Sequence, residues 1–217
     1  MSINKIAMSF ALAGILGASG ALAETSGVFV GLQGNTNFGS MTNKTEYEGG
    51  DSEKNTNTQN QIGVLGGYKF FFMPEFGVRA YGVLNYQNRQ NKYESGKDTD
   101  STLGVNANVD ALYNFVSTES LDFGLFAGVS LGYASNTSKD EPDVGDSSKT
   151  TTSGFDAGIN FGLRANVAQN HGLELYSRFG LTEQKKDETE NYGGGDVKIT
   201  HKNKQPYTIG LRYTYSF

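Results

Sequence analysis

The sequence predicts an all-β fold, an eight-stranded antiparallel up-and-down barrel that crosses a membrane, with short periplasmic turns and long extracellular loops. Three observations lead to this prediction. Apolar and polar residues alternate in eight stretches of similar length, the connections between stretches alternate between short and long, and every charge inside a stretch lies on its polar side.

The eight stretches have the period of two that is typical of β-strands with one apolar face. The last one, Tyr207–Phe217, places Tyr or another large apolar residue at every second position up to the final residue. A tilted membrane strand needs about 9–11 residues to cross the hydrocarbon layer. The predicted strands meet this length and are Gly27–Asn35, Gln61–Phe72, Phe76–Tyr86, Leu103–Phe115, Leu121–Tyr133, Gly154–Val167, Gly172–Leu181 and Tyr207–Phe217.

The connections fall into two alternating size classes. Three are short, namely Met73–Glu75, Val116–Ser120 and Ala168–His171. Four are long, polar and charged, and we expect them to be loops: Asn37–Asn60, Gln87–Ser101, Ala134–Ser153 and Thr182–Pro206. Short turns on one side and long loops on the other are typical of outer membrane barrels. With an even number of strands, both chain ends lie on the periplasmic side.

Nine charged residues lie inside the predicted strands, and all nine are on the polar face. They are Lys69, Arg79, Asp110, Asp122, Asp156, Arg164, Glu174, Arg178 and Arg212. An eight-stranded barrel is just wide enough for side chains to fill it, and buried charges must be paired. We therefore expect a lumen charge network with little continuous water, with inward glycines such as Gly158 and Gly162 leaving room for arginine.

The opposite face carries the large apolar residues, with rings near the strand ends, as in the aromatic girdles of membrane barrels. A basic residue at the bilayer midplane costs about 2–4 kcal/mol, which explains why this face has no charge. The competing interpretation is a secreted soluble sandwich or lipocalin-like barrel with the rings inside. The inward glycines and the long loops on one side only argue against it.

The N-terminus predicts an export signal over residues 1–23. Lys5 is followed by an apolar run that ends in Ala21-Leu22-Ala23, the small-x-small pattern of a cleavage site. The alternative is a membrane anchor, but the run is short and interrupted by Gly and Ser. The barrel domain is then 24–217, and we expect it in the cell outer membrane.

Composition excludes several functions. The chain has no Cys, so disulfides, thiolate metal sites and a cysteine nucleophile are ruled out. A net charge of −5 gives no reason to expect nucleic acid as a partner. Mean hydropathy is −0.46, a value that taken alone is typical of a soluble protein. No metal-ligand spacing and no cofactor motif is present, so we expect no metal and no cofactor.

Two features resemble catalytic motifs. Gly128-Val129-Ser130-Leu131-Gly132 fits the G-x-S-x-G pattern, but that motif requires a strand-to-helix elbow, and here it lies inside a strand. His201 lies in the last long loop near Ser and Thr residues, where a rim-located lipid-modifying enzyme could use it, and His171 lies in a short turn. Exposed loop histidines are far commoner than catalytic ones, so we expect no enzyme.

Several blocks resemble the Helicobacter-type outer membrane protein family. They include Leu65–Phe72, Gly77–Gly82, Asn108–Phe115, Gly124–Gly128, Gly162–Asn166, His171–Leu175 and the closing Arg212–Phe217, and the likeness spans about residues 62–217. The resemblance implies an outer membrane β-barrel among porin-like proteins and adhesins. Adhesins of the family carry a large domain ahead of the barrel strands, whereas here only a short stretch from Glu24 precedes them.

The functional prediction is a structural or surface-interacting barrel with a closed lumen. A small porin-like channel is the alternative, and a lipid-modifying enzyme is a third hypothesis. The expected partners are outer membrane lipid and lipopolysaccharide, the barrel assembly machinery, and a host or surface ligand contacted through the loops. Tyr213, Tyr215 and Phe217 in the terminal strand match the signal that the assembly machinery reads.

Overall fold

The computed structural model describes residues 24–46, 52–93, 96–118, 120–142, 147–191 and 196–217. Within these ranges all regular elements are strands. No helix of the described residues is long and apolar enough to span a bilayer. The predicted export signal, residues 1–23, lies outside the described residues. The strands are β1 (Gly27–Glu46), β2 (Ser52–Phe71), β3 (Phe76–Tyr93), β4 (Gly96–Ser117), β5 (Leu121–Pro142), β6 (Ser148–Val167), β7 (His171–Gly180), β8 (Gln184–Asn191) and β9 (Asp196–Ser216).

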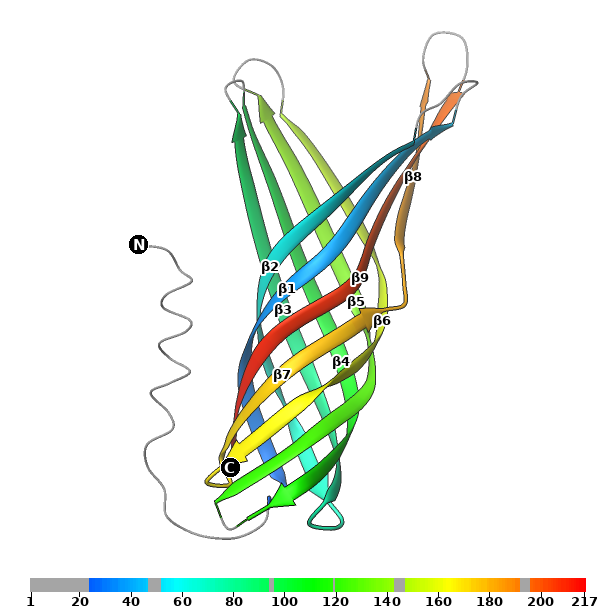
Figure 1. Ribbon diagram of the computed structural model, residues 1–217. Helices are drawn as coiled ribbons and strands as arrows, with labels where there is room; N and C mark the ends of the chain where they lie inside the picture. The colour runs from blue at the N-terminus through cyan, green and yellow to red at the C-terminus, as the bar shows by residue number, and fades with distance from the viewer. Residues whose placement is uncertain (1–23, 47–51, 94–95, 119, 143–146, 192–195) are drawn as a thin grey trace.

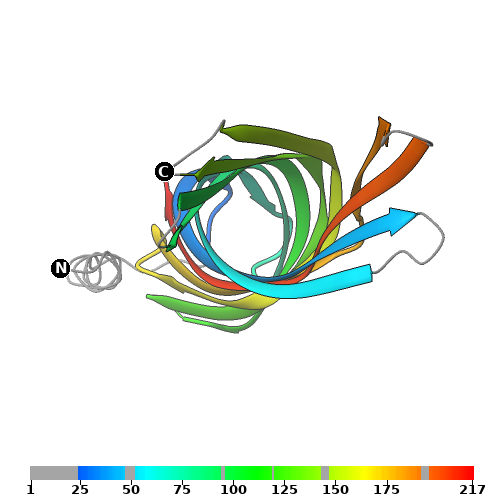
Figure 2. The ribbon, with the colours of Figure 1, turned by 90° about the horizontal axis from the view of Figure 1, so that it is seen from above.

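The strands form one closed antiparallel sheet (Figure 1, Figure 2). Each strand from β1 to β6 pairs with the next, β7 pairs with β9, and β9 pairs back with β1. β7 and β8 pair with the lower and upper halves of β9, so together they make one stave of the cylinder. The predicted eight-stranded up-and-down barrel is therefore confirmed.

The short turns lie at the same end of the barrel as the C-terminus (Figure 1). The turn between β6 and β7 has three residues, and Ala168 and Gln169 have left-handed φ values of 51° and 65°. Left-handed backbone costs a non-glycine residue about 1–2 kcal/mol. This turn is anchored to the neighbouring one, because the Ala168 amide donates to the Ser120 carbonyl at 2.8 Å.

The prediction of four long loops was wrong for most of their length. The strands continue well beyond the barrel, so that β1 reaches Glu46 and β2 starts at Ser52, and the other long connections are built the same way. These paired extensions are called the arms here. Both faces of an arm are rich in Ser, Thr, Asn and charged residues, so the apolar alternation that marks a membrane strand is absent. The backbone pairing continues without it.

The arms separate into two groups above the barrel (Figure 1). The β2–β3 ladder ends at Gln61 and Gln87, and the β6–β7 ladder ends at Gly158 and Gly180. Beyond these points β8, β9, β1 and β2 pair with one another, and β3 to β6 form the second group. The closed cylinder thus corresponds to the part with apolar alternation.

Burial alternates along the strands as the sequence pattern requires. On β4, the even positions from Thr102 to Asn114 are buried, while the odd positions from Leu103 to Phe115 are exposed. The exposed residues are apolar and the buried ones are mostly polar, which inverts the arrangement of a water-soluble barrel. The polar side of the sheet is therefore the inside, and the apolar side is the outer surface.

Candidate functional site: the barrel lumen

All nine charges predicted for the strands point into the barrel. Eight are buried, and Asp156, whose side chain is 23 % exposed, is half-buried. Eight of the nine take part in ion pairs within 4 Å, and Asp122 is the remaining one. The side chains form three levels along the barrel axis, described below from the middle outward.

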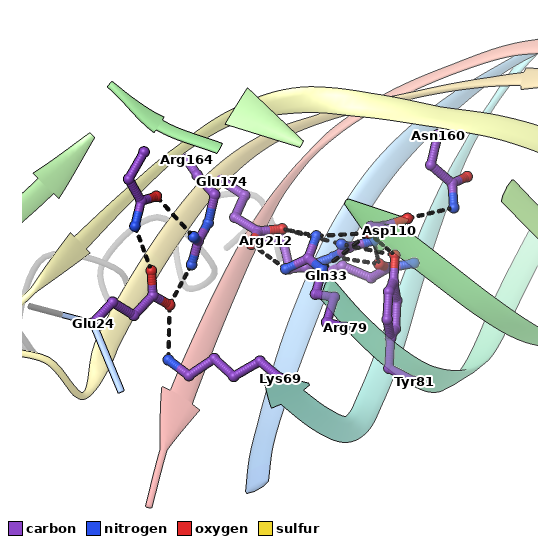
Figure 3. Close-up of polar contacts among 11 residues, drawn as sticks. Glu24, Gln33, Lys69, Arg79, Tyr81, Asp110, Asn160, Arg164, Glu174 and Arg212 are labelled. Atoms are coloured by element: carbon purple, nitrogen blue, oxygen red, sulfur yellow. Dashed lines mark hydrogen bonds and ion pairs between the residues drawn. The ribbon is translucent and has the colours of Figure 1, made fainter. Parts of the chain in front are cut away.

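The central level crosses the whole barrel. Arg79 on β3 donates through both terminal nitrogens to the Glu174 carboxylate on β7. In the closed strand order β3 and β7 are four staves apart in either direction, so these residues come from opposite walls. Arg79 Nε also donates to Asp110 at 2.9 Å, and Arg212 donates to Glu174 at 3.0 Å (Figure 3). Two cations and two carboxylates thus neutralise one another.

Aromatic rings surround this level. The guanidinium of Arg79 lies 4.6 Å from the ring centroid of Phe126, and that of Arg212 lies 4.3 Å from that of Tyr176. Cation–π contacts of desolvated arginines are worth about 2 kcal/mol. Tyr81 also donates its hydroxyl to Asp110 at 2.9 Å. The rings therefore exclude water from the ion pairs while satisfying their charges.

The expected lumen of paired charges and inward glycines did not include the apolar residues that also lie inside. Seven are buried, namely Phe29, Leu65, Tyr81, Val83, Leu112, Phe126 and Tyr176. The sequence does indicate the inward direction of two of them. Tyr81 lies two residues after Arg79, and Tyr176 lies between Glu174 and Arg178, so both are on the charged face of their strands. The sequence prediction placed none of these seven residues on either face of the sheet.

The ion-pair level at the short-turn end of the barrel is centred on Glu24, which was not among the predicted network residues. Glu24, just ahead of β1, is 3 % exposed and accepts hydrogen bonds from Lys69 at 2.8 Å, Asn114 at 3.2 Å and Arg164 (Figure 3). Lys69 on β2 and Arg164 on β6 are again four staves apart. Burial acts to raise the pKa of Glu24, but Arg164 and Lys69 lower it more, so the pKa lies below its usual value.

The upper level is more polar. Arg178 donates to Asp156 and to the Ser130 hydroxyl, both at 2.9 Å, and Asn106 donates to Asp156 at 2.8 Å. Above it lies a polar cavity of about 40 Å³, bordered by Asn35, Asp156 and other polar residues. Its volume suits about three water molecules. The side-chain amide oxygen of Asn35, Oδ1, has no protein partner in the described part of the chain, which fits a hydrated space.

Asp122 differs from the other predicted network residues. It is 3 % exposed, but no ion pair within 4 Å joins it to another described residue, and its Oδ1 has no hydrogen-bond partner. It lies near the short-turn end of β5, next to the level that Glu24 completes. The structure therefore buries Asp122 without bringing it into the charge network.

The inward glycines make room for more than arginine. A methyl group at Gly158 would lie 2.6 Å from the Arg178 guanidinium, as expected. At Gly162 it would lie 2.7 Å from the Phe126 ring, and at Gly124 2.6 Å from the Asn114 amide. Glycine at these positions lets large side chains from neighbouring staves cross the narrow lumen.

Two of the three residues considered for catalysis, Ser130 and His171, have structural surroundings. Ser130 is buried in the lumen, accepts from Arg178 and donates to the Gly158 carbonyl at 3.3 Å. His171 shares a hydrogen bond of 2.8 Å with the Tyr213 hydroxyl. His201 lies on the β9 arm, and its side chain is outside the described residues. Within the described part of the chain, no three His, Asp or Glu side chains gather as a metal site.

The outer face carries apolar residues with the rings in two zones. Toward the arms, Phe38, Tyr207, Phe179 and Phe161 form a continuous row, with neighbouring ring centroids 5.9, 5.2 and 5.4 Å apart. At the opposite end, the terminal Tyr215 and Phe217 rings are 5.2 Å apart. Between the zones lie aliphatic residues such as Leu211, which is 66 % exposed. This is the distribution of a lipid-facing surface with interfacial girdles.

A closed sheet with an apolar outside and a charged, packed inside defines a transmembrane β-barrel of the outer membrane type. The family model described as Helicobacter outer membrane protein matches residues 63–217. The chain therefore belongs to the Helicobacter outer membrane protein family, as its sequence blocks suggested, and is an outer membrane protein.

The chain is similar to several solved structures, and one of them supports the same fold. The outer membrane protein OprG from Pseudomonas aeruginosa has a TM-score of 0.54 at 12 % identity, covering 90 % of this chain and 99 % of that one. Neisserial surface protein A gives 0.39 at 17 % identity, covering 89 % and 100 %. Ail of Yersinia pestis gives 0.37 at 15 %, covering 88 % and 99 %. A comparison with curated proteins gave no match.

Proposed function

We propose that this chain is a closed structural barrel that anchors four polar arms at the outer face of the outer membrane, and that it is neither a solute channel nor an enzyme. The observation that carries the proposal is the ion pair between Arg79 and Glu174, which joins opposite walls of the barrel. A conducting pore requires an open path along the axis, and this pair crosses that path.

Three further features support a closed lumen. Phe126 and Tyr176 pack beside the central ion pairs and are 1 % and 5 % exposed. The Glu24 cluster spans the barrel a second time at the periplasmic end. The lining of the polar cavity does not include Arg79, Glu174 or Arg212, so this space does not continue along the axis through the central level.

The surroundings of Ser130 and His171 argue against catalysis by these two residues. Ser130 is held between Arg178 and a backbone carbonyl inside the lumen, away from lipid substrates. His171 contacts Tyr213 and the Tyr215 ring, an arrangement that suits an interfacial anchor. No step of acyl transfer follows from either geometry, because neither residue has the nucleophile–base pairing that such chemistry requires.

The arms supply the surface for partners. Their exposed rows of hydroxyls, such as Ser135 opposite Ser153 and Thr137 opposite Thr151, suit hydrogen bonding with polar surface ligands and lipopolysaccharide sugars. We infer that residues 1–23 are a cleaved export signal, and that Tyr213, Tyr215 and Phe217 present the C-terminal strand to the barrel assembly machinery. The apolar belt contacts outer membrane lipid.

Single-channel recording in planar lipid bilayers tests the proposal. The wild-type protein should insert without producing steady conductance steps, since the Arg79–Glu174 level blocks the axis. The double variant Glu24→Ala with Glu174→Ala should give openings, because both bridges between opposite walls are removed. Steady, large openings of the wild-type protein would support the porin-like alternative and overturn the closed barrel.

A further inference from the structure

Among the described side chains, the charges that point into the lumen balance only when Glu24 is included. The strands contribute five cations, Lys69, Arg79, Arg164, Arg178 and Arg212, and four carboxylates, Asp110, Asp122, Asp156 and Glu174. Glu24 supplies the fifth carboxylate from a position ahead of β1. The compensating charge is thus carried by a segment outside the barrel wall.

The groups that receive Glu24 are all provided by the wall. Lys69, Asn114 and Arg164 come from β2, β4 and β6, and they are 4 %, 1 % and 7 % exposed. All three are hydrogen-bond donors. Lys69 and Arg164 both reach Oε1 of Glu24, and Asn114 reaches Oε2, so both carboxylate oxygens are bound. Two cations and an amide converging on one point favour a carboxylate of any origin.

We propose that Lys69, Arg164 and Asn114 form a carboxylate-binding site at the periplasmic end of the lumen, with Glu24 as its tethered occupant. The tether is short. The Ser26 hydroxyl accepts a hydrogen bond of 2.8 Å from the Phe71 amide, and β1 begins at the next residue. A tether of this length gives an effective concentration of about millimolar or more, so the chain's own carboxylate occupies the site.

Removing the Glu24 side chain leaves two buried cations without their partner, which is strongly unfavourable. The site then has the size and charge to take a small carboxylate such as acetate from solution. A ligand that binds only the folded protein raises its stability with concentration. Acetate should therefore stabilise a Glu24→Ala variant and leave the wild-type protein unchanged.

Thermal unfolding in detergent micelles at pH 7 tests this, with sodium acetate compared with sodium chloride at equal ionic strength. Glu24→Ala should unfold at a lower temperature than wild type, and its midpoint should rise with acetate but not with chloride. The double variant Glu24→Ala with Lys69→Met should lose the acetate effect. Glu75→Ala removes an exposed carboxylate from the same end of the barrel and should behave like wild type in both salts.

Three results would overturn the proposal: an unchanged midpoint in Glu24→Ala, an equal response to acetate and chloride, or an acetate effect that persists in the double variant. If Glu24→Ala refolds poorly, the same comparison is made on the refolded fraction. Acetate in the refolding buffer should then increase the yield and chloride should not. Equal yields in the two salts would contradict the site.

Discussion

Arg79 and Glu174 are 95 residues apart in the chain and meet at the centre of the barrel, each projecting from the wall opposite the other. Their contact is bidentate, and each has a further partner, Asp110 for Arg79 and Arg212 for Glu174. The pair therefore links the two halves of the sheet through the lumen, in addition to the backbone ladders around the circumference.

Glu174→Met should destabilise the barrel by about 3–5 kcal/mol, because Arg212 then loses its carboxylate partner and Arg79 keeps only Asp110 in a buried site. The double variant Arg79→Met with Glu174→Met restores the charge balance. It should cost less than the sum of the two single changes, with a coupling of about 0.5–3 kcal/mol. Urea unfolding of the four proteins in micelles measures this, and strict additivity would show that the residues act independently.

Leu211→Arg should destabilise the inserted barrel by about 2–4 kcal/mol, the cost of a basic residue facing the bilayer midplane. Leu211 is on the outer face, four residues from both Tyr207 and Tyr215, so it lies midway between the two aromatic zones. Thr151→Arg, at an exposed position on the β6 arm, is the matched control and should change stability by less than about 0.5 kcal/mol. Equal costs for the two changes in lipid vesicles would contradict the assigned membrane position.

Ala168→Gly should stabilise the protein by up to about 1 kcal/mol. Its φ of 51° is unfavourable for a side chain with Cβ by about 1–2 kcal/mol, and the greater flexibility of glycine in the unfolded chain offsets part of the gain. Ala168→Val should be destabilising, since β-branched residues tolerate this region poorly. The midpoint of urea unfolding measures both changes. A loss of stability in the glycine variant would show that the backbone of Ala168 is not strained.

The contribution of Glu24 should depend on pH. Its pKa in the folded protein is held below that of the unfolded chain, so the ionised carboxylate stabilises the barrel above about pH 4.3. That stability is lost as the pH falls through the lowered folded-state pKa. The stability difference between wild type and Glu24→Gln should therefore shrink on acidification. A difference that stays constant from pH 7 to pH 3 would contradict the ion pairs.

Alternation and charge position were enough to predict the barrel and the inward direction of the nine charged strand residues. Leu103 to Phe115 alternates so regularly that the exposed and buried faces of β4 follow directly from the sequence. A charge on the lipid-facing side of a membrane strand is costly. The alternate positions that contain Arg79 and Arg212 are therefore predicted to face the lumen. The family blocks, later matched over residues 63–217, supported the same assignment.

Other features left weaker signals. The arms have no apolar face, so their strand pairing is invisible to a pattern based on hydrophobicity. Phe126 and Tyr176 alternate in step with the charged residues of their strands, so they point into the lumen. Only a rule that every inward residue packs in the lumen, whatever its polarity, would have predicted this. Glu24 precedes the first strand, and its role follows from three-dimensional proximity to Lys69 and Arg164 rather than from sequence spacing.

Fluorescence quenching of single tryptophans tests the two-sided barrel most directly, since the native chain has no Trp. In reconstituted vesicles, Leu211→Trp should be strongly quenched by brominated lipid, because that side chain faces the hydrocarbon. Phe126→Trp should be quenched neither by brominated lipid nor by aqueous acrylamide, because a closed lumen surrounds it. Efficient acrylamide quenching of Phe126→Trp, or no lipid quenching of Leu211→Trp, would contradict the account.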